Sequence, residues 1–285
     1  MKKAVLVVSF GTTYRDARKN TIDIIEERIK DKFSDYEVRR AFTSFMIIKK
    51  LKDEYGIIED NPEEALDKLL RDGFQEVMVQ PLHIIPGEEY DYIKSVVDHY
   101  SHKGLFKSVE LGRPALYFKG IEKDIPDDYS IFVNAIKDYI PEKGTVLFMG
   151  HGSVHYSNAC YSCLQSVLHD LGYEDAYIAN VEGYPTLEHI LKKLKRNNVE
   201  ELTLVPLMLV AGDHAKNDMA GDEENSWKNI LIKEGMKVNI LLKGLGELTE
   251  FQNIYLKHID DCIQGRYYNL GKTKKRIKNA AADRF

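Results

Sequence analysis

The chain contains the same short segment twice. Residues 4–12 read AVLVVSFGT and residues 145–153 read TVLFMGHGS, with Phe10 where the second copy has His151. Each segment is a run of apolar residues that ends at a glycine, a pattern typical of a buried strand followed by a turn. Because the copies lie about half a chain length apart, they indicate an internal duplication. A side chain that can bind metal is present in only one of them.

A second match extends the duplication. The segment QEVMVQPLHIIPG (75–87) corresponds to EELTLVPLMLVAG (200–212), and each has a proline within an apolar run and a glycine after it. Between these segments, short Val/Ile/Leu-rich runs alternate with amphipathic stretches. We expect strands at 3–9, 36–44, 76–85, 145–149, 176–181 and 201–210, and helices at 16–33, 62–72, 88–100, 158–171, 186–195 and 217–234. This alternation predicts an α/β fold of two similar domains, each a parallel sheet flanked by helices.

The boundary between the two copies is expected near residues 113–128, where two prolines and a cluster of charges interrupt the pattern. We therefore predict an N-terminal domain over residues 1–125 and a C-terminal domain over residues 126–264. Residues 265–285 are strongly basic and weakly apolar, so we expect a solvated tail there.

Composition excludes several classes of protein. With 44% hydrophobic and 30% charged residues, the 285-residue chain is typical of a soluble globular protein. A net charge of -5 argues against a general nucleic-acid binder. No apolar run reaches the length of a membrane helix, and the first strand is not followed by a signal cleavage site. Three cysteines do not suggest a disulfide framework, so we expect a cytoplasmic protein without a membrane or nucleic-acid partner. A homo-oligomer is left open.

Three candidate metal ligands follow successive strands of the second half. His151, Glu182 and His214 lie 31 and 32 residues apart, about one strand–helix unit each time. Because parallel strands end at the same edge of a sheet, all three are expected on one rim. Two imidazoles and a carboxylate suit Co, Ni, Fe or Zn, and three protein ligands leave positions open for exchange. Each residue alone is also compatible with a solvated loop position or a helix cap. In the first half, Phe10 replaces His151, and Ser44 lies approximately where Glu182 would be.

The motifs MGHGSVHYSN, VEGYP and PLMLVAGDHAKND, in this order, resemble those of the anaerobic cobalt chelatases. These are class II tetrapyrrole chelatases that act on sirohydrochlorin. The resemblance runs from Lys3 to about Gln264 and includes SFGT and PLHIIPGEEY in the first half. It implies two α/β domains that face each other across a cleft for the macrocycle. It also implies a lyase that inserts Co²⁺ and releases two protons during cobalamin biosynthesis.

The resemblance further implies that His151, Glu182 and His214 form the catalytic metal site, with His151 as proton acceptor. A neutral imidazole suits both tasks because its pKa lies near the working pH. The other half would hold the ring. The residues expected to contact the substrate are Phe10, Gly11, Thr12, His83, Ile84, Ile85, Glu89, Gly152 and Ser153. For Glu89, which follows Glu88 at the start of a helix, stabilisation of the helix dipole is an equally good explanation.

We expect Co²⁺ to be the substrate metal and no nucleotide or organic cofactor to be needed. The ligand set does not separate cobalt from iron or nickel, because geometry and metal supply decide that choice. A non-catalytic carrier of tetrapyrrole or metal is the alternative from another functional class.

Overall fold

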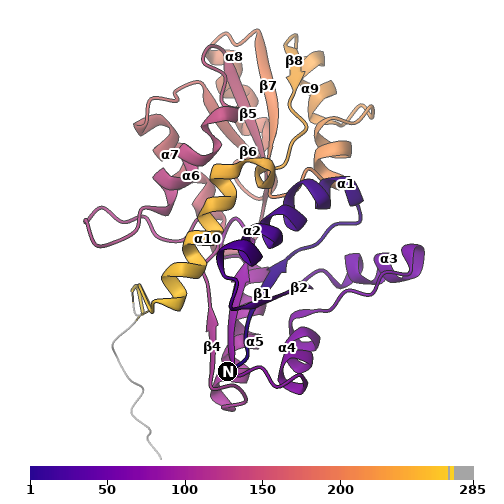
Figure 1. Ribbon diagram of the computed structural model, residues 1–285. Coiled ribbons are helices and arrows are strands. Elements are labelled where there is room, and N and C mark those ends of the chain that lie inside the picture. The colour runs from indigo at the N-terminus through magenta and orange to yellow at the C-terminus, as the bar shows by residue number, and fades with distance from the viewer. Residues whose placement is uncertain (269, 273–285) are drawn as a thin grey trace, which may run out of the picture.

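Two four-stranded parallel sheets form the framework of the computed structural model, which describes residues 1–268 and 270–272 (Figure 1). Their strand orders are β2-β1-β3-β4 and β6-β5-β7-β8, so the second sheet repeats the first. The strands are β1 (Lys3–Ser9), β2 (Glu37–Phe42), β3 (Glu76–Pro81), β4 (Ser108–Leu111), β5 (Thr145–Gly152), β6 (Ala176–Glu182), β7 (Glu201–Leu207) and β8 (Lys237–Ile240). The predicted fold class, including the internal duplication, is confirmed.

Helices cover both sheets. In the first half they are α1 (Arg15–Arg18), η1 (Lys19–Asp23), α2 (Ile24–Lys32), α3 (Phe45–Tyr55), α4 (Pro62–Arg71) and α5 (Glu88–His102). The second half contains α6 (Asp128–Ile136), η2 (Lys137–Tyr139), η3 (Tyr156–Asn158), α7 (Ala159–Asp170), α8 (Leu187–Arg196), η4 (Ala215–Met219), α9 (Trp227–Lys233), η5 (Leu245–Glu247) and α10 (Thr249–Ile263). The segments η1 and η4 are π-helical turns. The single helix expected at 217–234 is wrong, because η4 and α9 are separate there.

The central strands β1 and β5 are buried on both faces, which explains their uninterrupted apolar sequences. Their side chains belong to cores that bury Leu6 and Phe148 completely. A fully buried side chain of this size contributes about 1.5–3 kcal/mol relative to an exposed one. The largest core cluster contains residues of both sheets, so the two halves share part of their hydrophobic interior.

Helix α10 connects the halves. It packs against α6 of the second half and also against β3 and α2 of the first (Figure 1). The ring of Phe251 meets that of Phe132 edge-on at 5.3 Å, and the Tyr255 hydroxyl donates a hydrogen bond to the Leu82 carbonyl at 2.9 Å. The division at residues 125/126 stays a prediction, but α10 lies against the first sheet although its sequence belongs to the second half.

None of the helices described by the structure is long and apolar enough to cross a membrane. The basic tail expected at 265–285 falls largely outside the described residues.

Candidate metal-handling site

Two imidazoles meet at the carboxyl edge of the second sheet. His151 is the penultimate residue of β5, and His214 directly precedes the π-turn η4 that follows β7. Their ring centroids lie 4.9 Å apart, with the ring planes at 85°. Both side chains are half-buried. The topology brings together residues that are 63 positions apart in the sequence, as their places at strand ends predict.

Each imidazole has one nitrogen engaged by a protein oxygen. His151 Nδ1 lies 2.9 Å from the carbonyl oxygen of Gly152. His214 Nδ1 lies 2.5 Å from Oδ2 of Asp218, one π-turn further along the chain. In both residues Nε2 is therefore the nitrogen left for a metal ion or a proton.

Glu182 ends β6, the strand beside β5, and its side chain is exposed. The two strands approach closely here: a Cβ built on Gly152 would lie 1.4 Å from the Glu182 carbonyl oxygen. Only glycine fits this position, where φ is +78°. Within the described residues, no group of three or more His, Cys, Asp or Glu side chains is arranged to hold an ion. The structure thus brings the two histidines together without the Glu182 carboxylate, and the three-ligand set stays a prediction.

The corresponding edge of the first sheet is apolar at its tip. Phe10 follows β1 and is 44% exposed, whereas Thr12 is buried. Gly11 has φ +91°, the counterpart of Gly152. In the described part of the chain, the amides of Gly11 and Thr12 have no hydrogen-bond partner. They remain candidate donors to a substrate carboxylate.

The corresponding amides of the second half are already used. Gly152 donates to the Tyr161 hydroxyl at 3.4 Å, and Ser153 donates to Asn158 Oδ1 at 3.0 Å. Substrate contacts from Gly152 and Ser153 stay a prediction, but these bonds would compete with them.

After β3 the chain presents His83, Ile84 and Ile85, each partly exposed. Both ring nitrogens of His83 are shielded from solvent and have no hydrogen-bond partner among the described residues. Burial lowers the pKa of His83 to about 4, so its ring stays neutral near pH 7. Glu89 lies in the first turn of α5 and is half-buried.

Polar contacts hold the two edges against each other. The Tyr14 hydroxyl donates to Asp213 Oδ1 at 2.9 Å, and Lys216 Nζ lies 3.9 Å from the centroid of the Tyr14 ring. A second contact joins His155 Nε2 to Asp91 Oδ2 at 3.3 Å. The contacts therefore join segments near Phe10 and Glu89 of the first half to segments near His151 and His214 of the second.

Sequence reasoning missed these partners of the site. Asp218 could have been found from its i+4 spacing to His214, the separation at which helical side chains meet. No local pattern pairs Tyr14 with Asp213, because these residues are 199 positions apart.

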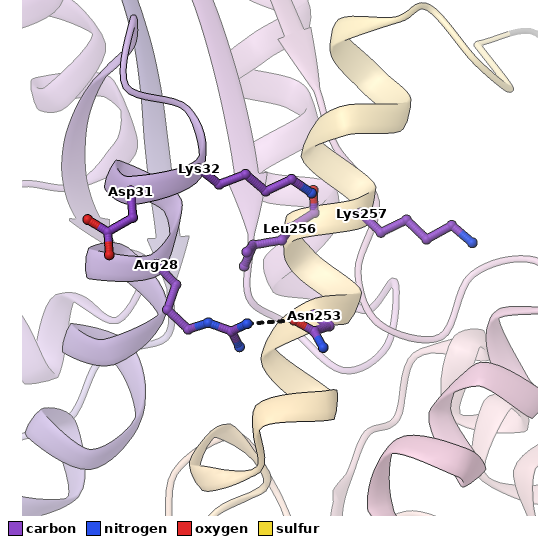
Figure 2. A pocket seen from close by; sticks show the side chains of 6 residues that line it. All are labelled: Arg28, Asp31, Lys32, Asn253, Leu256 and Lys257. Carbon is purple, nitrogen blue, oxygen red and sulfur yellow. Dashed lines mark hydrogen bonds between the residues drawn. The ribbon is translucent and has the colours of Figure 1, made fainter.

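A groove of about 600 Å³ lies elsewhere, between α2 and α10 (Figure 2). Its lining residues are Arg28, Asp31, Lys32, Asn253, Leu256 and Lys257. The Arg28 guanidinium donates to Thr249 O, Gln252 Oε1 and Asn253 Oδ1 at 2.7–3.0 Å. The groove contains none of the expected site residues, and Arg28 serves there to join the two helices.

Comparison with known proteins finds relatives over nearly the whole chain. A sirohydrochlorin cobaltochelatase of Salmonella typhimurium is 38% identical over 92% of this chain and 97% of its own length. The sirohydrochlorin cobaltochelatase CbiKC of Nitratidesulfovibrio vulgaris is 31% identical over 92% of this chain and 91% of its own length. Among solved structures, SirB from Bacillus subtilis with Fe³⁺ superposes with a TM-score of 0.62 at 16% identity, covering 92% of this chain and 95% of SirB. CbiX, described as the terminal enzyme of siroheme biosynthesis in denitrifying bacteria, gives 0.52 at 16% identity, covering 90% and 98%.

The two curated relatives place the chain in the class of metal chelatases, and the two repeated parallel sheets agree with the fold of the solved chelatases. The family model for cobalt chelatase (CbiK) matches residues 3–264. The chain belongs to this cobalt chelatase family.

Proposed function

We propose that this protein inserts Co²⁺ into sirohydrochlorin, with release of two protons, in anaerobic cobalamin biosynthesis. The observation that carries the proposal is the pair formed by His151 and His214, whose rings lie 4.9 Å apart at a strand-end rim. The two relatives named as sirohydrochlorin cobaltochelatases support the choice of macrocycle and metal.

The chemistry requires groups that accept protons and groups that hold a divalent ion. Metal insertion removes two pyrrole protons from the ring, and a positioned general base typically accelerates such a step about 10²- to 10⁴-fold. Neutral imidazole is a base near pH 7 and also a ligand for Co²⁺. We assign proton acceptance to His151 and metal binding to His151, His214 and Glu182. The exposed Glu182 side chain would turn toward the pair when the ion is present.

The two halves would divide the work. Residues 1–125 hold the ring through the apolar side chains of Phe10, Ile84 and Ile85, and residues 126–264 handle metal and protons. Support for this division comes from the contacts that set the two rims against each other. The reaction as proposed takes place in the cytoplasm and needs neither a nucleotide nor an organic cofactor.

The test is a visible spectrum. The protein mixed with sirohydrochlorin and Co²⁺ should shift the absorption bands of the ring faster than the protein-free mixture. His151→Ala and His214→Ala should each lower the protein-dependent rate by about 10²-fold or more, because each removes a base or a ligand. His169→Ala, an exposed position on α7, is the matched control and should keep the rate.

Three outcomes would overturn parts of the proposal. If both histidine variants keep the full rate, the roles assigned to the imidazoles are wrong. If the wild type binds the ring but never accelerates insertion, it is a carrier. If parallel assays with Fe²⁺ or Ni²⁺ give faster insertion than Co²⁺, the metal is assigned wrongly while the reaction class stands.

A further inference from the structure

The π-turn after β7 places a carboxylate directly on one of the two imidazoles. His214 Nδ1 and Asp218 Oδ2 are 2.5 Å apart. The side chains of His214 and Asp218 are 36% and 47% exposed, so the pair lies at the surface of the rim and is open to solvent. An exposed pair of this kind contributes little to stability. Its main consequence is therefore the orientation of the ring.

The hydrogen bond fixes which nitrogen carries the proton. An ionised carboxylate only accepts hydrogen bonds, so Nδ1 of His214 must be the donor. In the neutral ring, Nε2 then has a free lone pair. The same reasoning applies to His151, whose Nδ1 lies 2.9 Å from the Gly152 carbonyl oxygen. Both neutral imidazoles of the pair thus present Nε2.

The neighbouring acidic groups do not share this position. Asp213 accepts from the Tyr14 hydroxyl and from Asn217, and Asp222 is paired with Lys228 at 2.9 Å. Asp218 alone among these carboxylates touches His214 in the described residues. The π-helical geometry of η4 is the local feature that accompanies this contact.

We propose that Asp218 is a positioning residue that holds His214 as the Nδ1–H tautomer and keeps Nε2 free for the incoming divalent ion. The chemical role of the ion rests on the proposed function, but the tautomer and the ligand role of Nε2 are properties of the protein alone.

The first measurement uses metal-free protein with ¹⁵N-labelled histidine in mildly alkaline buffer. Long-range ¹H–¹⁵N spectra distinguish Nδ1–H from Nε2–H directly, and His214 in the wild type should show Nδ1–H. Asp218→Ala should shift His214 toward a mixture of tautomers. Asp218→Asn, which keeps a neutral acceptor, should restore part of the wild-type population. Asp222→Ala removes the same charge from the same segment and should leave the His214 signals unchanged.

The second measurement is titration with Co²⁺ alone. Loss of a carboxylate bonded to a metal-binding histidine typically costs about 10- to 100-fold in affinity, so we expect that loss for Asp218→Ala. For Asp222→Ala we expect less than twofold. Circular dichroism spectra establish that each variant is folded.

The proposal is overturned if wild-type His214 is the Nε2–H tautomer, or if Asp218→Ala changes neither the tautomer nor the Co²⁺ affinity. It is also overturned if the affinity falls while the tautomer stays fixed, because Asp218 would then bind the ion itself. Failure of the proposed function is a separate result: the protein would not accelerate cobalt insertion into sirohydrochlorin, whatever the tautomer of His214.

Discussion

The two rims of the molecule share a scaffold and differ in chemistry. At the carboxyl ends of β1 and β5 lies a glycine with positive φ, Gly11 at +91° and Gly152 at +78°. The residue before that glycine is Phe10 in one half and His151 in the other. In the first half, Glu89 lies two positions after Gly87, the glycine that follows β3. In the second half, His214 lies two positions after Gly212, the glycine that follows β7. The scaffold is the same, and the side chains at the tips have diverged.

Burial explains why divergence concentrates at the tips. Residues within β1 and β5 are buried on both faces, and substitutions there disturb a packed core. Phe10 and His151 lie at the partly exposed edge, where most substitutions cost little stability. A duplicated chain can therefore acquire a proton acceptor in one copy and an apolar contact in the other without losing either sheet.

The comparison of the two halves assumes that each half folds by itself. The prediction with the largest expected effect tests this assumption. Arg113 follows β4 of the first half and donates to Asp128 and Asp261 of the second, each at 3.0 Å. All three side chains are at least 92% buried. Burial raises the pKa of Asp128, but hydrogen bonds from His258 and Arg113 outweigh it and hold the pKa below its usual value. Arg113→Met would leave two buried carboxylates without this partner and should cost about 3–5 kcal/mol in urea unfolding.

Arg266→Met is the matched control. Arg266 also contacts Asp261, at 3.1 Å, but its side chain is 45% exposed. We expect a loss below about 1 kcal/mol for it. If Arg113→Met unfolds in two transitions with one at the wild-type midpoint, the halves are autonomous. A single transition shifted as a whole means that α6, α10 and the first sheet unfold together.

The next prediction compares the two rim glycines. Gly152→Ala should cost about 3 kcal/mol, because alanine is strained at positive φ and its Cβ would lie 1.4 Å from a backbone carbonyl oxygen. At Gly11 the nearest atoms belong to the Phe42 ring, at 2.7 Å, which can shift more easily than backbone. Gly11→Ala should therefore cost about 1–2 kcal/mol in the same urea experiment. Equal losses would show that the two turns are equally constrained and that strand approach at Glu182 is not the special feature of the second rim.

The duplication and the strand-end histidines could be predicted because they depend on local apolar runs and on topology. Four-residue strands such as β4 and β8 carry too few residues for a pattern, and the sequence did not predict them. Helix α3 was missed as well. Its first residues, Phe45 and Met46, are 61% and 71% exposed, so its apolar residues do not mark a single buried face.

Some of the other features depend on contacts between distant parts of the sequence. The packing of α10 on β3 joins residues such as Tyr255 and Leu82, 173 positions apart. The predicted correspondence of Ser44 with Glu182 agrees with the strand registers, since Phe42 pairs with Ser9 as Asn180 pairs with Gly150. The Ser44 hydroxyl caps α3 by accepting from Ile47 N at 3.3 Å. The contact between His214 and Asp218 is local, and its i+4 spacing is the signal that could have indicated it.

The last prediction concerns the strand end where the first half has His83 and the second has Met208. Burial lowers the pKa of folded His83 from 6.5 to about 4. As the pH falls below 6.5, the unfolded chain therefore takes up this proton before the folded protein does, and stability decreases. Stability then falls by at most about 1.4 kcal/mol per pH unit, and it stops falling near the pKa of folded His83. His83→Met copies the residue of the second half and removes this dependence.

Urea unfolding of wild type and His83→Met at pH 7 and pH 5 measures the effect. Between these two pH values the wild type should lose about 2 kcal/mol more than the variant, since 1.5 pH units lie between 6.5 and 5. His169→Met, at an exposed position of α7, should retain the wild-type pH dependence. If His83→Met also retains it, then His83 is protonated in the folded protein at pH 5, and the first rim would carry an ionisable base of its own. The contrast between a ring-holding half and a proton-handling half would then fail at this residue.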